Sequence, residues 1–176
     1  MRLSLLIAGL AALAGTGLAL AQSAVTPFAG QWVGKATVET LGPTDFPNSV
    51  RDVGVTLTED AAGGFKLEWS TVKRESGDPN QPDEKATDTV VDFTSAGENR
   101  WTGPAADPAK GQPLWIARLD GTTLIVSGFA ITEEGQAELQ TYARTIEDGT
   151  MGLVYSRVLE GTVTRRASGT LTKFAP

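Results

Sequence analysis

The chain has 176 residues, a formal net charge of −6 and a hydrophobic content of 40%, and it contains neither histidine nor cysteine. These missing residue types exclude Ser-His-Asp and Cys-His catalysis, disulfides, haem ligation by histidine, and the usual zinc and copper sites. We therefore expect no metal centre and no cofactor. The acidic balance, without any basic tract, predicts that the partner is not a nucleic acid.

Residues 1–21 have the pattern of a secretory signal peptide. Arg2 precedes an apolar stretch that runs to Leu20, and small residues two positions apart end the segment at Ala21. The alternative is a retained membrane anchor, although the stretch is short for a helix that spans a bilayer. We expect a periplasmic or secreted bacterial protein, with no stable membrane insertion after cleavage, whose residues 22–176 form a single domain.

Alternation of apolar and polar residues with a period of two begins over residues 30–40 and returns at 53–57, 65–69 and 91–93. This pattern is typical of antiparallel strands with one buried face and one solvated face. The side chains that it predicts to be buried are Trp32, Val38, Val55, Leu67, Trp69 and Phe93.

The second half of the chain continues the series of strands. Segments 114–119 and 123–131 are apolar on both faces, so we expect a second layer or a lid to cover them. Residues 134–146 also have helical spacing, but their threonine, tyrosine and isoleucine content favours a strand. The pairs Asp148-Gly149 and Glu160-Gly161 suit two-residue hairpin turns, because both residues of such a pair accept positive φ.

Strands joined by short hairpins form a meander, and a meander with one apolar face usually closes because closure removes unpaired edges. The sequence therefore predicts an all-β fold, an antiparallel up-and-down barrel of about eight to ten strands. Segments 74–85 and 103–113 lack apolar periodicity and are expected to be loops. An interior of this size is either filled by side chains or holds one small ligand.

Gly30, Gln31 and Trp32 stand at the start of the first strand. There they resemble the Gly-x-Trp signature of lipocalins, in which the tryptophan closes the narrow end of the barrel beneath an arginine from a late strand. The resemblance implies a lipocalin-like barrel, a structural plug made by Gly30 and Trp32, and a small ligand inside. The arginines available to cover the tryptophan are Arg157, Arg165 and Arg166. The first strand is also similar to that of small periplasmic barrels that inhibit metalloproteases with their N-terminal tail.

The two hairpin turns predict how the last three strands oppose one another. Tyr142 is expected opposite Tyr155, and Tyr155 opposite Arg166, so one sheet face carries both tyrosines and three arginines beside aliphatic side chains. The candidate ligand-binding residues are Tyr142, Arg144, Tyr155, Arg157 and Arg166. If this face points inward, it can hold a carboxylate or phosphate together with an apolar tail. If it points outward, it is a solvated ladder of cross-strand contacts.

The acidic clusters of the chain are weaker candidates for a functional site. Segment 78–84 offers oxygen ligands for calcium, but it lacks the spacing and the glycine of an EF-hand loop. The pairs Glu133-Glu134 and Glu147-Asp148 lie at strand ends, where carboxylates are ordinarily solvated.

The resulting expectation is a non-enzymatic, exported binding protein for a small hydrophobic or amphipathic ligand, which could be anionic. The alternative is a protein-binding barrel, such as an inhibitor of a secreted enzyme. A calycin-like enzyme is a third alternative. It would need a carboxylate, tyrosine or lysine deep in a pocket with a perturbed pKa.

Overall fold

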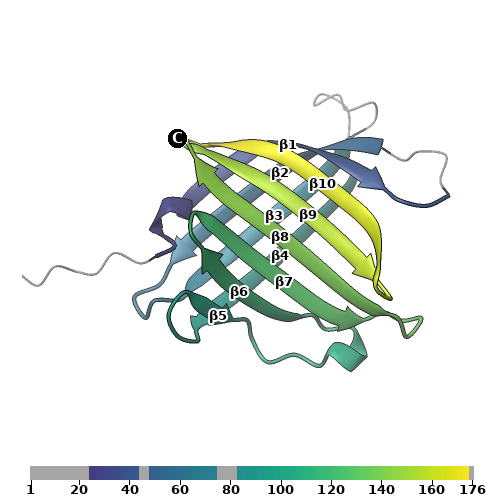
Figure 1. Cartoon of the computed structure of the whole chain (residues 1–176). Helices are drawn as coiled ribbons and strands as arrows, with labels where there is room; N and C mark the ends of the chain where they lie inside the picture. Colours follow the sequence, from purple (N-terminus) through teal and green to yellow (C-terminus); the bar gives the residue numbers. More distant parts are fainter. Residues whose placement is uncertain (1–23, 44–47, 75–82, 175–176) are drawn as a thin grey trace, which may run out of the picture.

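The computed structural model describes residues 24–43, 48–74 and 83–174, within which ten antiparallel strands close into one barrel (Figure 1). The strands follow one another in space as they do in sequence, and β1 pairs with β10 to complete the ring. They are β1 (Gly30–Thr40), β2 (Asn48–Glu59), β3 (Phe65–Arg74), β4 (Asp83–Ser95), β5 (Arg100–Thr102), β6 (Leu114–Asp120), β7 (Thr123–Ile131), β8 (Ala137–Glu147), β9 (Thr150–Leu159) and β10 (Thr162–Lys173). The predicted all-β, up-and-down barrel is confirmed.

Two 3-10 helices accompany the strands, η1 (Thr26–Phe28) before β1 and η3 (Pro108–Lys110) between β5 and β6. No helix in the described part of the chain is long and apolar enough to cross a membrane. The predicted signal peptide, residues 1–21, lies outside the described residues. So does the acidic segment 78–84, apart from its last two positions.

The core follows the period-two pattern of the sequence, because successive side chains of a strand point to opposite faces of the sheet. All six residues that the pattern predicted to be buried are at most 7% exposed: Trp32, Val38, Val55, Leu67, Trp69 and Phe93. β8 is a strand throughout Ala137–Glu147, as its composition predicted. The hairpin turn that follows it has positive φ at both Asp148 and Gly149.

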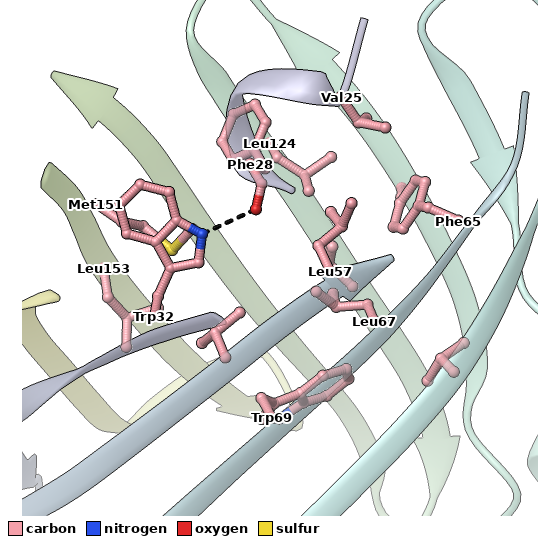
Figure 2. Packing of buried hydrophobic residues seen from close by; sticks show 14 of the residues in the cluster. Val25, Phe28, Trp32, Leu57, Phe65, Leu67, Trp69, Leu124, Met151 and Leu153 are labelled. Carbon is pink, nitrogen blue, oxygen red and sulfur yellow. Dashed lines mark hydrogen bonds between the residues drawn. The ribbon is translucent and has the colours of Figure 1, made fainter. Parts of the chain in front are cut away.

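One end of the barrel is closed by the N-terminal segment of the described chain. Val25, just before η1, and Phe28, within η1, are both buried in the core. The Trp32 indole N–H donates to the Phe28 carbonyl at 2.8 Å (Figure 2). Gly30 has φ +105°, and a Cβ there would lie 2.9 Å from Lys173 Cε, so this turn into β1 requires glycine. Trp32 therefore lies inside the closed end, where it is 2% exposed.

None of the three predicted arginines covers Trp32. Lys173 stands opposite Trp32 in the β1–β10 ladder, and its Nζ lies 5.4 Å from the centroid of the Trp32 ring. The antiparallel closure explains the difference, because it brings the end of β10 beside the start of β1. Arg165 and Arg166 pair with Thr40 and Glu39 at the other end of β1.

The outer faces of β6 and β7 differ from the prediction. Leu114, Ile116 and Phe129 are 44%, 52% and 39% exposed, so nothing in the described chain covers them as a second layer or lid. These three apolar side chains occupy outward-facing positions of a barrel wall that is a single layer thick. Leu114, Phe129 and Leu139 oppose one another in register across β6, β7 and β8 and form an exposed apolar row.

Candidate ligand-binding cavity

The end of the barrel remote from η1 contains a cavity of about 500 Å³. Small-molecule sites typically measure roughly 300 to 1,000 Å³. The side chains that line it come from eight of the ten strands and from the segment before β6. They are Ala36, Val38, Arg51, Val53, Trp69, Thr71, Lys85, Thr87, Thr89, Pro113, Trp115, Glu138, Gln140, Tyr142, Leu153, Tyr155, Arg157, Arg165 and Ala167.

Aromatic rings form the inner wall of this cavity, which we call the aromatic floor: Trp69, Trp115, Tyr142 and Tyr155. Ring centroids are 5.3 Å apart for the two tryptophans, 5.2 Å for Trp69 and Tyr142, and 4.7 Å for the two tyrosines. The tyrosines oppose each other across β8 and β9, as the hairpin turn predicted. Burial raises the pKa of both phenols, so they remain neutral at physiological pH.

Gly128 makes room for one ring of the aromatic floor. It lies directly opposite Trp115 in the β6–β7 ladder, and a Cβ at Gly128 would lie 2.4 Å from Cζ3 of the indole. Real Cβ atoms do not approach other atoms so closely. The position of Trp115 therefore depends on the absence of a side chain at residue 128.

Charged side chains surround the outer part of the cavity. Arg157 donates from Nε and Nη2 to the Glu138 carboxylate, the first of these bonds being 2.6 Å long. The Gln140 amide donates to the other oxygen of Glu138, and the Tyr142 hydroxyl donates to the Gln140 carbonyl oxygen at 2.9 Å. Glu138 is the only carboxylate among the lining residues that the structure describes, and it already accepts hydrogen bonds from Arg157 and Gln140.

Arg165 lies in the wall beside this network. A β-bulge between Val163 and Arg165 shifts the pairing of β10 with β9 by one residue, so Arg165 stands directly opposite Arg157. Arg165 Nε is buried and has no hydrogen-bond partner within the described structure. Like charges directly opposite each other destabilise a sheet. The wall therefore holds a buried cationic donor that the described chain leaves without an acceptor.

The same bulge corrects the prediction for Arg166. Arg166 pairs with Ser156 and is exposed on the outer face, and Ala167 takes the place opposite Tyr155. A one-residue shift sends every later side chain of a strand to the opposite face. Arg166 is consequently not among the residues that line the cavity.

Arg144 lies deeper than any other cation of the barrel's inner face. It is 1% exposed, and its Nε and Nη1 have no hydrogen-bond partner among the described residues. Its guanidinium carbon lies 5.3 Å from the Trp69 ring centroid and 5.2 Å from that of Tyr142. Burial lowers the pKa of Arg144 to about 10, against the opposing influence of Tyr142, so the group is charged at neutral pH.

The sheet face that carries the tyrosines and Arg157 therefore points into the barrel and not toward solvent. Tyr142, Tyr155 and Arg157 line the cavity, and Arg144 lies directly beneath the aromatic floor. The lining residues that the candidate list omitted include Arg51, Lys85, Trp115, Glu138 and Arg165. Within the described residues no cluster of acidic side chains is arranged to hold a metal ion.

These features define a closed antiparallel barrel with one plugged end and one open cavity. No protein-family model and no curated protein sequence matches the chain. Among solved structures, the fold is similar to Rv2717c from M. tuberculosis, with a TM-score of 0.57 and 11% identity over 86% of this chain and 96% of that one.

Two further solved structures align with most of this chain. A protein of unknown function from the DUF3598 family of Nostoc punctiforme has a TM-score of 0.53 and 13% identity, over 85% of this chain and 48% of that one. The S-type phycobiliprotein lyase CPES from Guillardia theta has a TM-score of 0.39 and 8% identity, over 85% of this chain and 90% of that one. At these identities the likeness concerns the fold alone.

Proposed function

We propose that the protein is an exported, non-enzymatic, lipocalin-like barrel that binds a small, partly apolar anion in the open cavity. The observation that carries this proposal is the buried Arg165 Nε, a cationic donor in the cavity wall with no acceptor in the described chain. A buried N–H donor without an acceptor costs about 1 to 3 kcal/mol, and more in a charged group. A carboxylate or phosphate group of a ligand would supply the missing acceptor.

The apolar part of the ligand is assigned to the aromatic floor. Trp69, Trp115, Tyr142 and Tyr155 offer flat faces that stack on a ring or pack against an aliphatic chain. Leu153 and Val53 add aliphatic surface beside them. A head group at Arg165 and an apolar body on the aromatic floor would fill both parts of the same cavity.

Binding without catalysis is favoured by the state of Glu138, the one carboxylate in the described lining of the cavity. Glu138 accepts hydrogen bonds from Arg157 and Gln140, and its side chain is 12% exposed, so it is poorly placed to take a proton from a substrate. The two phenols have raised pKa values and are weak bases and nucleophiles at neutral pH. Turnover of bound acids into new products, followed by mass spectrometry, would contradict this part of the proposal.

The anion site is tested by calorimetric titration of the mature protein with naphthoate, an aromatic monoacid, and with octanoate, an aliphatic one. Naphthalene methanol serves as the uncharged analogue. We expect both acids to bind. Arg165→Leu should weaken their binding free energy by about 1.5 to 3 kcal/mol, the range for a hydrogen bond to a charged group. Arg166→Leu is the matched control, because the neighbouring residue lies on the outer face. Equal affinity in all three proteins would remove Arg165 from the site.

Export rests on the sequence of residues 1–21 and is tested separately. The full chain is expressed in a bacterium with two membranes, and the periplasmic fraction is collected. We expect the protein in this fraction, with an intact mass that begins at Gln22. A full-length chain that remains in the membrane fraction would favour the retained anchor instead.

A second candidate function, binding to another protein, is favoured by the exposed apolar row of Leu114, Phe129 and Leu139. Exposed apolar surface of this kind is common where proteins meet. Inhibition of a secreted metalloprotease, lost in a Phe129→Ser and Leu139→Ser double variant, would support it. Inhibition that survives the double variant, or no inhibition of any protease tested, would reject this row as an inhibitory surface.

A further inference from the structure

Two guanidinium groups on the inner face of the barrel contain buried nitrogens without a hydrogen-bond partner in the described structure, and they lie at different depths. Arg165 Nε is buried in the cavity wall, and Arg144 Nε and Nη1 are buried beneath the aromatic floor. We infer that the natural ligand is a flat, apolar molecule carrying at least two acidic groups, one held at Arg165 and one at Arg144. This inference rests on the proposed function and specifies the class of ligand.

The spacing of the two arginines suits a rigid ligand with acids at both ends. Gln140, Arg157 and Arg165 are level with one another in the ladders of β8, β9 and β10. Arg144 follows Gln140 by four positions in β8, which is about 13 Å in an extended strand. Between these two levels lie the Tyr142 and Tyr155 rings. A frame of two or three fused rings would span this distance while its faces lie against the aromatic floor.

The described lining of the cavity also carries more cationic than anionic side chains. Its cationic side chains are those of Arg51, Lys85, Arg157 and Arg165, and its one carboxylate is that of Glu138. Glu138 is already paired with Arg157. Arg144 adds a fifth positive charge beneath the floor, in a chain whose formal net charge is −6. A monoacid would supply an acceptor to only one of the two guanidinium groups with unpartnered nitrogens, whereas a diacid would supply an acceptor to each of them.

A single layer of side chains separates Arg144 from the cavity. Trp69 and Tyr142 both line the cavity and both contact the Arg144 guanidinium. The second acidic group would reach Arg144 when one of these rings turns aside. Because Trp69 is one of the two rings, the intrinsic tryptophan fluorescence should change when a diacid binds and change less when a monoacid binds.

The test compares naphthalene dicarboxylate with naphthoate in the mature protein, by calorimetry and by tryptophan fluorescence. Naphthyl phosphate is a third arm, which distinguishes a phosphate from a carboxylate head group. We expect the dicarboxylate to bind at least about tenfold more tightly than the monoacid, the advantage of one more charged hydrogen bond. Arg144→Met should abolish this advantage while leaving the affinity for naphthoate nearly unchanged. Arg166→Leu should preserve it.

Each outcome separates the two proposals. If naphthoate and the dicarboxylate bind equally well, or if Arg144→Met keeps the tenfold ratio, the diacid inference is wrong and the monoacid site stands. If neither acid binds, the proposed function fails as well. Arg144→Lys retains the charge and guards against a folding defect in the Met variant, and circular dichroism reports whether each variant is folded. A folded Lys variant that retains part of the preference for the diacid, beside a Met variant that loses it, would support a charged partner at position 144.

Discussion

Trp32 joins the first strand to the closed end of the barrel. Its side chain is 2% exposed, and its indole N–H donates to the Phe28 carbonyl at 2.8 Å. We expect Trp32→Ala to lower the free energy of unfolding by about 3 to 5 kcal/mol, because it leaves a large cavity in the core. Trp32→Phe keeps most of the volume and should lose less. Urea denaturation measures both, and a loss below about 1 kcal/mol in the alanine variant would contradict the plug.

Arg144 is a residue whose binding role and contribution to stability should oppose each other. Its charge is buried with two unpartnered nitrogens, and a buried donor left without an acceptor costs about 1 to 3 kcal/mol. We therefore expect Arg144→Met to raise the free energy of unfolding of the ligand-free protein. A fall of similar size would show that the contacts with Trp69 and Tyr142 compensate the charge.

The two tyrosines predict how stability responds to alkaline pH. Burial raises the pKa of Tyr142 and of Tyr155 above the ordinary value of 10.0. Above pH 10 the unfolded chain has lost these protons while the folded chain retains them, so the unfolding free energy falls as the pH rises. These are the only tyrosines of the chain, and ultraviolet titration of the folded protein can follow them directly. Titration at or below the ordinary value would contradict their burial.

At the scale of single strands, β6 and β7 offer a controlled test of the aromatic floor. A Cβ at Gly128 would overlap Trp115, so Gly128→Ala should displace the indole and cost about 1 to 3 kcal/mol of stability through overpacking. Gly152→Ala in β9 is the control, because the nearest atom to its Cβ would be Thr145 O at 3.8 Å. We expect naphthoate to bind more weakly to the first variant only. Unchanged binding to Gly128→Ala would mean that Trp115 does not contact the ligand.

Strands were predictable because a sheet with one buried face imposes a period of two on the sequence. The tight turn at Asp148-Gly149 then placed Tyr142 opposite Tyr155, since a two-residue hairpin determines its own register. The bulge after Val163 was not predictable, because one inserted residue leaves no mark in a short polar stretch. Because of this bulge, Arg165 lines the cavity and the predicted Arg166 does not.

Barrel closure brings together residues that no local pattern connects. Arg51 and Lys85 reach the cavity from β2 and β4, whereas Arg157 and Arg165 come from β9 and β10. Their meeting depends on the stagger of all ten strands, which is a property of the whole ring. The sequence pattern therefore predicted the barrel and, of these four cations, only Arg157 as a ligand-binding residue, and the other three required the structure.

The contrast between an acidic chain and a cationic cavity predicts how salt acts on binding. The formal net charge is −6, yet the described lining of the cavity has four cations and one carboxylate. Salt screens exposed charges over a Debye length of about 10 Å at 0.1 M and about 3 Å at 1 M, but screens buried charges much less. Raising the salt concentration should therefore weaken the part of naphthoate binding that comes from exposed cations such as Lys85, and leave more of the additional affinity that the dicarboxylate gains at Arg144. Titrations of both ligands across this salt range measure the two effects separately. A diacid advantage that disappears at high salt would place the second acidic group among the exposed cations instead of beneath the aromatic floor.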